Sequence, residues 1–256
     1  MKMDILTNKG NGILTITFNR PDKKNAITAA MYQTIADTLK SAETDKEVSV
    51  ALITGRPEIF TAGNDLDDFL KNPPQDTQSP VYQFIQALMH FTKPVIAAVC
   101  GPAVGIGTTM LLHCDFVYAA DNAQFSMPFA KLGLCPEFAS SLLLPQIAGY
   151  QRAAEKLMLG EPFSAQDACE MGFVNKVLPV AEVLAFAQAQ AAKLVVLPTS
   201  SMKATKSLMK GKQIPAVEAK IIEESILFGE MLVSNEAKEA FIAFFEKRKP
   251  DFTKFK

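Results

Sequence analysis

The sequence predicts an α/β fold, and three observations support this prediction. Before residue 198, short apolar segments typical of strands alternate with amphipathic segments typical of helices. Two of the apolar segments lead directly into a glycine-containing turn and a helix start. From about residue 198 onward the strand pattern stops, and only helical patterns remain. We therefore expect a core of strand–turn–helix units and a helical C-terminal region.

The core elements are predicted in chain order from their periodicity and end signals. A strand is expected at 13–18, where side-chain polarity alternates, and a turn cluster at 19–25 follows it. Thr28 can cap the next helix, which carries an apolar face of Met31, Ile35 and Leu39. Four further short strands are expected at 50–54, 95–99, 116–119 and 125–127.

Two later segments depart from this alternation. Residues 71–80 contain three prolines and almost nothing apolar, which predicts a mobile loop, either bordering a pocket or simply connecting two helices. Helices are expected at 201–210, 216–233 and 235–249. Their apolar faces need another surface to cover them, from the core or from a neighbouring subunit. These faces include Ile221, Ile222, Ile226, Leu227, Phe241, Phe244 and Phe245.

Composition and charge exclude several classes of function. The formal net charge of the 256 residues is −1, which gives no basic surface for nucleic acid or an anionic membrane. No apolar run approaches the roughly 20 residues of a membrane span, and the N-terminus is too polar for a signal peptide. The four cysteines lack CxxC spacing, which favours free, buried thiols in a reducing compartment. We expect a cytoplasmic protein.

Metal and serine-hydrolase chemistry are also disfavoured. The two histidines, His90 and His113, have no metal-ligand partners at helical or turn spacing. We expect one to be a surface residue and the other to pack in a helix, and we expect no metal site. No serine lies in a GxSxG elbow.

The two glycine turns are the most informative segments. Residues 101–107 (Gly-Pro-Ala-Val-Gly-Ile-Gly) connect an apolar strand to a helix, and residues 60–66 have the same layout. The first amides of a helix have no internal partners, and the helix dipole favours negative charge there. Two such turns can direct two backbone N–H groups at one carbonyl oxygen.

Six motifs in this order resemble the crotonase, or enoyl-CoA hydratase/isomerase, superfamily. The resemblance runs nearly end to end, at 20–27, 60–66, 100–107, 123–128, 131–133 and 244–250. It implies a crotonase-like spiral of ββα units at 1–197 with an acyl-CoA site, and a helical trimerisation region at 198–256. It also implies an acyl-CoA thioester as substrate, no separate cofactor, and a homotrimer or a dimer of trimers.

The resemblance also implies roles for individual residues. The backbone amides of Asn64 and Ile106 correspond to the family's oxyanion hole, which holds a thioester enolate. Asp65 is also a candidate cap for the helix after the first loop. Ala62 stands where many relatives have serine, which leaves the backbone donor at Asn64 intact. The positions expected to contact substrate are Lys24, Ala62, Gly63, Asp65, Leu66 and Gly105.

The reaction depends on the carboxylates. At the positions of the two glutamates of family hydratases this chain has Thr109 and Phe129, which disfavours hydration. Glu137 remains, flanked by Leu132, Leu134 and Phe138, which would raise its pKa. It is either a surface glutamate at a helix start or a catalytic base. Its surroundings resemble those of the peroxisomal-type delta-3,delta-2-enoyl-CoA isomerases, whose single catalytic glutamate falls on this position.

The resemblance therefore implies a 3-enoyl-CoA to 2-enoyl-CoA isomerase that works through a dienolate. Two alternatives remain at this point. One is another crotonase-type enzyme, such as a dehalogenase, a hydrolase-like enzyme or a weak hydratase. The other is a non-catalytic acyl-CoA-binding homologue.

Overall fold

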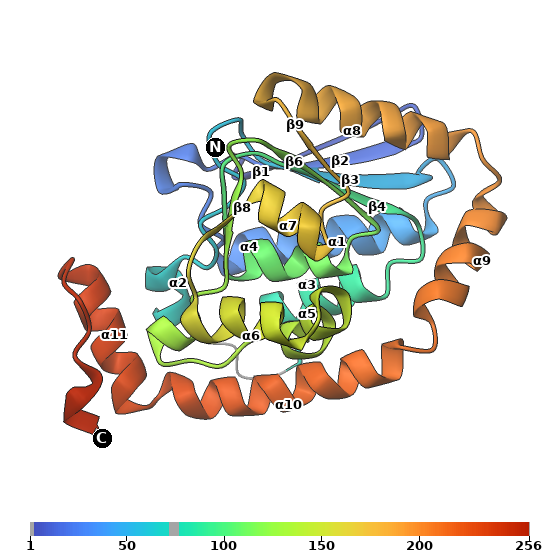
Figure 1. Ribbon diagram of the computed structural model, residues 1–256. Coiled ribbons are helices and arrows are strands. Elements are labelled where there is room, and N and C mark those ends of the chain that lie inside the picture. Colours follow the sequence, from blue (N-terminus) through green and yellow to red (C-terminus); the bar gives the residue numbers. More distant parts are fainter. Residues whose placement is uncertain (1–2, 72–76, 256) are drawn as a thin grey trace.

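A six-stranded sheet forms the centre of the computed structural model, which describes residues 3–71 and 77–255 (Figure 1). The strand order is β1-β2-β3-β4-β6-β9; β1 and β2 are antiparallel, and all other neighbours are parallel. The strands are β1 (Ile5–Gly10), β2 (Ile13–Phe18), β3 (Val50–Thr54), β4 (Val95–Val99), β6 (Phe116–Ala120) and β9 (Lys176–Leu178). A smaller sheet contains β5 (Pro102–Val104), β7 (Gln124–Ser126) and β8 (Phe163–Ser164). The mixed α/β fold is thereby confirmed.

Helices cover both faces of the main sheet. On one face, α8 (Val180–Val195) buries alanine and valine side chains against β3 and β4 (Figure 1). On the other face, α1 (Ala29–Thr44) buries Met31, Ile35 and Leu39. Because both faces are covered, β3 and β4 are buried along their whole length, as is usual for parallel strands.

The remaining helices are mostly short and follow the strands in turn. They are α2 (Leu66–Lys71), α3 (Pro80–Met89), α4 (Ile106–Thr109), α5 (Ser140–Ala148), α6 (Tyr150–Leu159) and α7 (Ala165–Met171). Short 3-10 helices lie at η1 (Pro21–Lys23), η2 (Met110–His113), η3 (Ala130–Leu132) and η4 (Phe252–Phe255).

Most predicted core elements are confirmed. The strands at 13–18, 50–54 and 95–99 have the predicted bounds, and the hydroxyl of Thr28 accepts a hydrogen bond from the Met31 amide at the start of α1. Strands β1, β5, β8 and β9 were not predicted. Of the loop predicted at 71–80, residues 72–76 lie outside the described residues, and Pro80 already begins α3.

Three helices wrap around the core after residue 198. They are α9 (Thr199–Lys210), α10 (Ile214–Leu232) and α11 (Asn235–Phe245), and α10 runs along the edge of the molecule opposite α8 (Figure 1). Helix α11 ends at residue 245, four residues earlier than predicted. Helix α9 is tied to the core by Asp115, whose carboxylate forms ion pairs with Lys206 at 2.7 Å and Lys210 at 3.1 Å.

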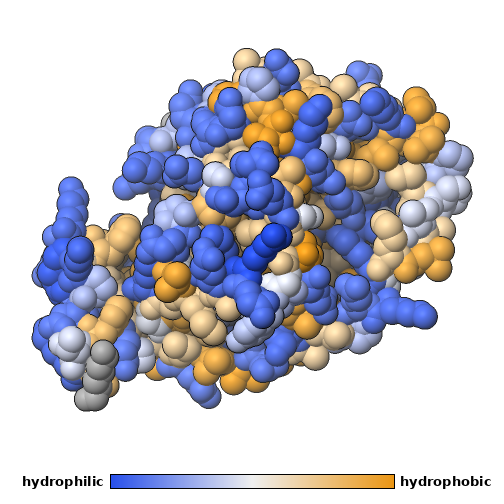
Figure 2. All heavy atoms as spheres, in the orientation of Figure 1, coloured by the Kyte–Doolittle hydropathy of each residue, from blue (hydrophilic) through white to orange (hydrophobic). Residues whose placement is uncertain are grey.

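The apolar faces of these last helices are only partly covered by the chain's own core. Ile221 and Phe241 are buried, whereas Ile226 and Phe244 are 62% and 58% exposed. Figure 2 shows apolar side chains along the lower edge of the molecule, in the region of α10. A substantial apolar surface on α10 and α11 is therefore left uncovered by the single chain.

Other expectations concern membranes, metals and thiols. Within 3–71 and 77–255 no single helix is long and apolar enough to cross a membrane. Helices α8 and α9 taken together have the length and composition of a membrane span, but the chain bends by 108° between them. No group of three metal-ligating side chains occurs in the same ranges. The four cysteines are free, as predicted, but only partly buried.

Candidate active site

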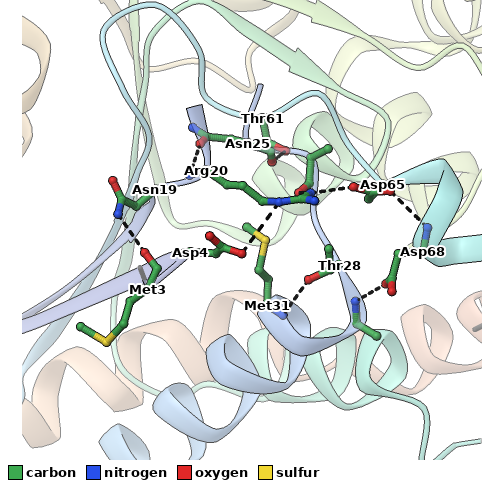
Figure 3. Close-up of polar contacts among 12 residues, drawn as sticks. Met3, Asp4, Asn19, Arg20, Asn25, Thr28, Met31, Thr61, Asp65 and Asp68 are labelled. Atoms are coloured by element: carbon green, nitrogen blue, oxygen red, sulfur yellow. Dashed lines mark hydrogen bonds and ion pairs between the residues drawn. The ribbon is translucent and has the colours of Figure 1, made fainter. Parts of the chain in front are cut away.

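The first glycine turn is anchored by a buried asparagine. Asn25 is fully buried; its side chain accepts from the Arg20 amide and donates to the carbonyls of Ile59 and Phe60. Its own carbonyl accepts from the hydroxyl of Thr61 at 2.7 Å. Figure 3 shows this side chain beside Thr61 and Arg20. The turn cluster at 19–25 therefore fixes the backbone that leads into the first glycine turn.

An ion pair fixes the far end of the same turn. The Arg20 guanidinium donates to the carboxylate of Asp65 at 2.6 Å (Figure 3). The other carboxylate oxygen accepts from the Asp68 amide at 3.1 Å, so Asp65 caps α2 as predicted. Burial is the largest single effect and would raise the pKa of Asp65, but the hydrogen bonds from Arg20 and the Asp68 amide and the charges of Arg20 and Lys23 together lower it. Asp65 therefore stays ionised and acts as a structural clamp at the cavity wall.

The second glycine turn packs directly against the first. Strand β5 pairs with Thr61, and α4 starts one residue after Gly105, which has φ +55°. Gly63 has φ +84°, and a Cβ there would lie 2.6 Å from the carbonyl oxygen of Val104. Only glycine combines this backbone conformation with such a close approach. The close contact explains the glycine at 63, and the backbone conformation of φ +55° and ψ −120° explains the glycine at 105.

The amides of Asn64 and Ile106 are available at this junction. Within the described residues, neither amide donates a hydrogen bond to a protein acceptor. Ile106 is the first residue of α4, where backbone amides lack helical partners. The side chain of Asn64 is held separately, because its carbonyl oxygen accepts from the Tyr32 hydroxyl at 2.5 Å. Two unused backbone donors therefore lie on two turns that contact each other.

Glu137 lies in the loop between η3 and α5. It is partly exposed because it lines a cavity, and its carboxylate accepts from the Thr109 hydroxyl at 2.5 Å. Removal from bulk water raises the pKa of Glu137 to about 8, although the Thr109 hydrogen bond acts in the opposite direction. A carboxylate with this pKa is a much stronger base than an exposed glutamate.

The backbone beyond Glu137 has an unusual conformation that distant side chains support. Phe138 and Ala139 have φ +57° and +56°, a region that residues other than glycine seldom occupy. The Phe138 carbonyl accepts from His113, whose ring stacks on the Phe138 ring at 3.8 Å. Burial lowers the pKa of His113 to about 3, so the ring is neutral and its Nε2–H is the donor. His113 is thus a packing residue, as predicted, and His90 is exposed.

Two adjoining cavities meet at the glycine turns. The outer cavity has a volume of about 510 Å³ and the inner one about 430 Å³, and both are lined by Asn64 and Ile106. Glu137 lines the inner cavity, together with apolar side chains from α3 and α10. The outer cavity is lined by the predicted substrate-contacting positions and by Phe129, namely Lys24, Ala62, Gly63, Asp65, Leu66, Gly105 and Phe129. The structure therefore gathers all the predicted site residues around two cavities that share Asn64 and Ile106.

The sequence did not identify every residue of this space. Phe228 from α10 lines both cavities, and Phe241 from α11 lines the outer one, so the C-terminal helices contribute to the site. Tyr32 lines neither cavity but holds the Asn64 side chain through its hydroxyl; it was also missed, because a tyrosine in an amphipathic helix gives no sign of its hydrogen-bond partner. A third cavity, of about 490 Å³, lies under α9 and is lined by none of the predicted site residues. Its three lysines already form ion pairs, Lys203 with Glu43 and both Lys206 and Lys210 with Asp115.

Comparison with known proteins identifies both isomerases and hydratases among the relatives of this chain. Enoyl-CoA delta isomerase 2 of Rattus norvegicus is 36% identical over 250 residues, covering 95% of this chain and 64% of the relative. This chain thus spans slightly less than two thirds of that protein's length. 2,3-Dehydroadipyl-CoA hydratase of Escherichia coli (strain K12) is 32% identical over 253 residues, covering 97% of this chain and 98% of the relative.

A solved structure and a family model agree with these matches. The structure of Pseudomonas aeruginosa OdaA is 48% identical with a TM-score of 0.93, covering 95% of this chain and 99% of that one. The model described as enoyl-CoA hydratase/isomerase matches residues 8–255. This chain belongs to the enoyl-CoA hydratase/isomerase, or crotonase, family.

Proposed function

We propose that this protein is an isomerase that moves the double bond of a 3-enoyl-CoA to the 2-position. One observation carries the proposal: Glu137 is the one carboxylate among the described residues lining the inner cavity, where it joins Asn64 and Ile106. An isomerisation needs a single group that removes a proton and returns it. The similarity to a rat enoyl-CoA delta isomerase supports the same reaction.

The proposed reaction begins with proton removal from C2. The Glu137 carboxylate takes the C2 proton, and the electrons of that C–H bond delocalise into the thioester carbonyl and the C3–C4 double bond. The amides of Asn64 and Ile106 donate hydrogen bonds to the oxygen of the resulting dienolate. Donors of this kind contribute about 3 kcal/mol each in enzymes where one has been removed.

The second step returns the same proton to C4. Protonated Glu137 donates it as the dienolate collapses, which leaves the double bond between C2 and C3 and restores the carboxylate. The raised pKa of Glu137, about 8, suits both steps because it lies near neutral pH. No cofactor is required, since coenzyme A is part of the substrate.

Hydration is disfavoured by the side chains at the other two key positions. Thr109 is fully buried and donates its hydroxyl to Glu137, and Phe129 places a buried ring at the outer cavity. Neither side chain can activate water as a base near neutral pH. Together with the apolar lining of the inner cavity, they favour a water-poor site in which the dienolate is protonated at carbon.

We also propose that copies of the chain assemble into a homotrimer or a dimer of trimers through the region 198–256. The exposed apolar side chains of α10 and α11, including Ile226 and Phe244, support this assembly. Light scattering at micromolar concentration is expected to give the mass of a trimer or hexamer. A stable monomer would contradict the assembly without affecting the proposed chemistry.

The reaction is tested by comparing two substrates. Purified protein is expected to convert 3-hexenoyl-CoA into the conjugated 2-enoyl-CoA, which is followed by the new ultraviolet absorbance. Crotonyl-CoA is expected to be hydrated slowly or not at all. A hydration rate comparable with the isomerisation rate would overturn the proposal. Tight binding of both thioesters without turnover would instead indicate a non-catalytic homologue.

A further inference from the structure

We propose that Glu224 on helix α10 is a positioning residue, whose buried carboxylate holds the backbone of 139–141 so that Glu137 faces the inner cavity. This inference rests on the proposed role of Glu137. It assigns to the C-terminal helical region a part in the active site of its own chain.

The hydrogen bonds of the Glu224 carboxylate are with the segment that follows Glu137. Its side chain is nearly fully buried, with the whole residue 5% exposed. One carboxylate oxygen accepts from the Ala139 amide at 2.6 Å, and the other accepts from the Ser141 amide at 3.0 Å and from the Ser141 hydroxyl at 2.5 Å. Three donors thus converge on one carboxylate and favour its ionised form, although burial still leaves the pKa of Glu224 raised.

These contacts supply the hydrogen bonds that the start of α5 lacks. Ser140 is the first residue of α5, and its N-cap, Ala139, has a methyl side chain that cannot accept a hydrogen bond. Glu224 replaces a local cap from 83 residues away, and its negative charge also complements the positive end of the helix. The same bonds hold Ala139 at φ +56°, a conformation that alanine does not favour by itself.

The strained segment leads directly to the catalytic carboxylate. The Glu137 carbonyl accepts from the Ser140 amide at 3.1 Å and from the Ser140 hydroxyl at 2.7 Å, so the turn of 137–140 is closed on itself. His113 secures Phe138 from the opposite side, and Thr109 secures the carboxylate of Glu137. Glu224 is the partner that fixes Ala139 and Ser141, and without it the orientation of Glu137 would be less well defined.

The charged groups around Glu137 and Glu224 determine how the pKa of Glu137 responds to a substitution. Glu137 accepts from the Thr109 hydroxyl and interacts electrostatically with Tyr32 and with the carboxylate of Glu224, while His113, which contacts Phe138, is neutral. Glu224 itself faces Lys220 on its own helix and, across the loop, Cys135. Burial is the main cause of the raised pKa of Glu137, and the like charge of Glu224 raises it further.

The test is Glu224→Gln, which keeps the size of the side chain. Gln has one acceptor oxygen, and its amide group faces at least one N–H donor, so the hold on the loop weakens. We expect kcat for 3-hexenoyl-CoA to fall about ten- to a hundredfold with KM nearly unchanged, because misplacing a reacting group has effects of this size. We also expect the acidic limb of the kcat/KM profile to move down by up to about one pH unit, because a like charge is removed.

Controls separate positioning from general destabilisation. Glu223→Gln changes the neighbouring glutamate of α10, which is exposed and paired with Lys220, and is expected to leave both kcat and the pH profile unchanged. Ser141→Ala removes one of the three donors to Glu224 and is expected to lower kcat by a few fold. Should Glu224→Gln fail to fold, the Ser141→Ala variant carries the kinetic test alone.

Amide hydrogen exchange provides a readout that does not depend on the reaction. In Glu224→Gln the peptide covering 137–142 is expected to exchange faster, while exchange in β3 and β4 stays unchanged. If wild-type protein does not isomerise 3-enoyl-CoA, the proposed function fails. Hydrogen exchange alone then tests whether Glu224 holds the backbone of 139–141. Unchanged exchange in this peptide, or an unchanged kcat and pH profile, would overturn the inference.

Discussion

The two glycine turns and the Glu137 loop meet at one cavity but are held in different ways. The turns contact each other through backbone, at the approach of Gly63 to the carbonyl of Val104 and the pairing of Thr61 with β5, and the side chains of Asn25 and Arg20 hold the first turn. The Glu137 loop is fixed by side chains far away in sequence, from Thr109, His113 and Glu224. The proposed oxyanion donors are therefore backbone groups, whereas the proposed base is a side chain whose direction depends on other side chains.

This difference has a functional consequence. A backbone donor is present whatever side chain stands at its position, so the proposed oxyanion hole should tolerate side-chain changes near it, such as alanine at residue 62. The carboxylate has no such protection, since its direction and pKa depend on several separate groups. Substitutions in the two regions should therefore lower kcat to different extents, and changes around Glu137 should also shift the pH profile; four experiments examine this.

The largest effect is expected from Glu137→Gln. Gln fills the same space and can accept from Thr109, but it cannot take a proton, so kcat for 3-hexenoyl-CoA should fall by about three to four orders of magnitude. Binding of the acyl-CoA should persist, because the glycine turns are untouched. The control is Glu182→Gln, an exposed glutamate at the start of α8, which should leave turnover unchanged. Near wild-type turnover in the Glu137 variant would remove this residue from the mechanism.

The next largest effect is expected from Gly63→Ala. The added Cβ would lie 2.6 Å from the Val104 carbonyl oxygen, which displaces the turn that carries the Asn64 amide. Loss of one oxyanion donor should lower kcat by about a hundredfold. Gly149→Ala is a matched control, with a similar φ of +82° but no atom within 4 Å of the new Cβ. Both variants should melt a few degrees lower, and an equal loss of activity in both would contradict the local role of the turn.

A smaller effect on pH dependence is expected from Thr109→Val. The proposed mechanism needs Glu137 ionised in the free enzyme, so kcat/KM should rise with pH and reach half its maximum near pH 8. The Thr109 hydrogen bond stabilises the ionised form and lowers the pKa of Glu137. Its removal should therefore move the acidic limb of the kcat/KM profile to higher pH, by up to about one pH unit. Thr109→Ser keeps the hydroxyl and should retain the wild-type profile. A downward shift in the valine variant would mean that Thr109 stabilises the protonated acid.

The smallest effect is expected from Lys24→Gln. Lys24 lines the outer cavity, where its charge can attract the phosphates of coenzyme A. Exposed charge pairs contribute about 0.2–1 kcal/mol, so KM should rise about two- to fivefold at low salt with kcat unchanged. Lys46→Gln changes an exposed lysine that does not line the cavity, and it should leave KM unchanged. An equal KM change in both variants would show that the outer cavity makes no specific contact with the phosphates.

The fold was predictable where strands are apolar throughout. Strands β3 and β4 are buried on both faces, so their sequences are continuous apolar runs. Strand β1 was missed because only Ile5 of its six residues is buried and the rest of its side chains are exposed. Strand β5 was missed because its three residues form part of a glycine turn, and only pairing with β7 makes them a strand.

The site was predictable to the extent that its chemistry is local. Glycine turns after apolar strands indicated the two sets of backbone donors without any knowledge of tertiary structure. Glu137 could be singled out only through the family pattern, because a glutamate after Pro136 is also common at the start of a surface helix. Glu224 could not be distinguished from Glu223 beside it, since one is buried and the other exposed only because of how α10 packs on the core.

The central claim is that one carboxylate moves a proton from C2 to C4 in a site that holds little water. It is tested most directly with 3-hexenoyl-CoA that carries deuterium at both C2 hydrogens, converted in ordinary water and followed by mass spectrometry and NMR of the product. If Glu137 carries the proton, a measurable share of the product should bear deuterium at C4, and this transfer should disappear in Glu137→Gln. A product whose C4 hydrogen comes entirely from solvent, formed equally well by the Glu137→Gln variant, would contradict the account.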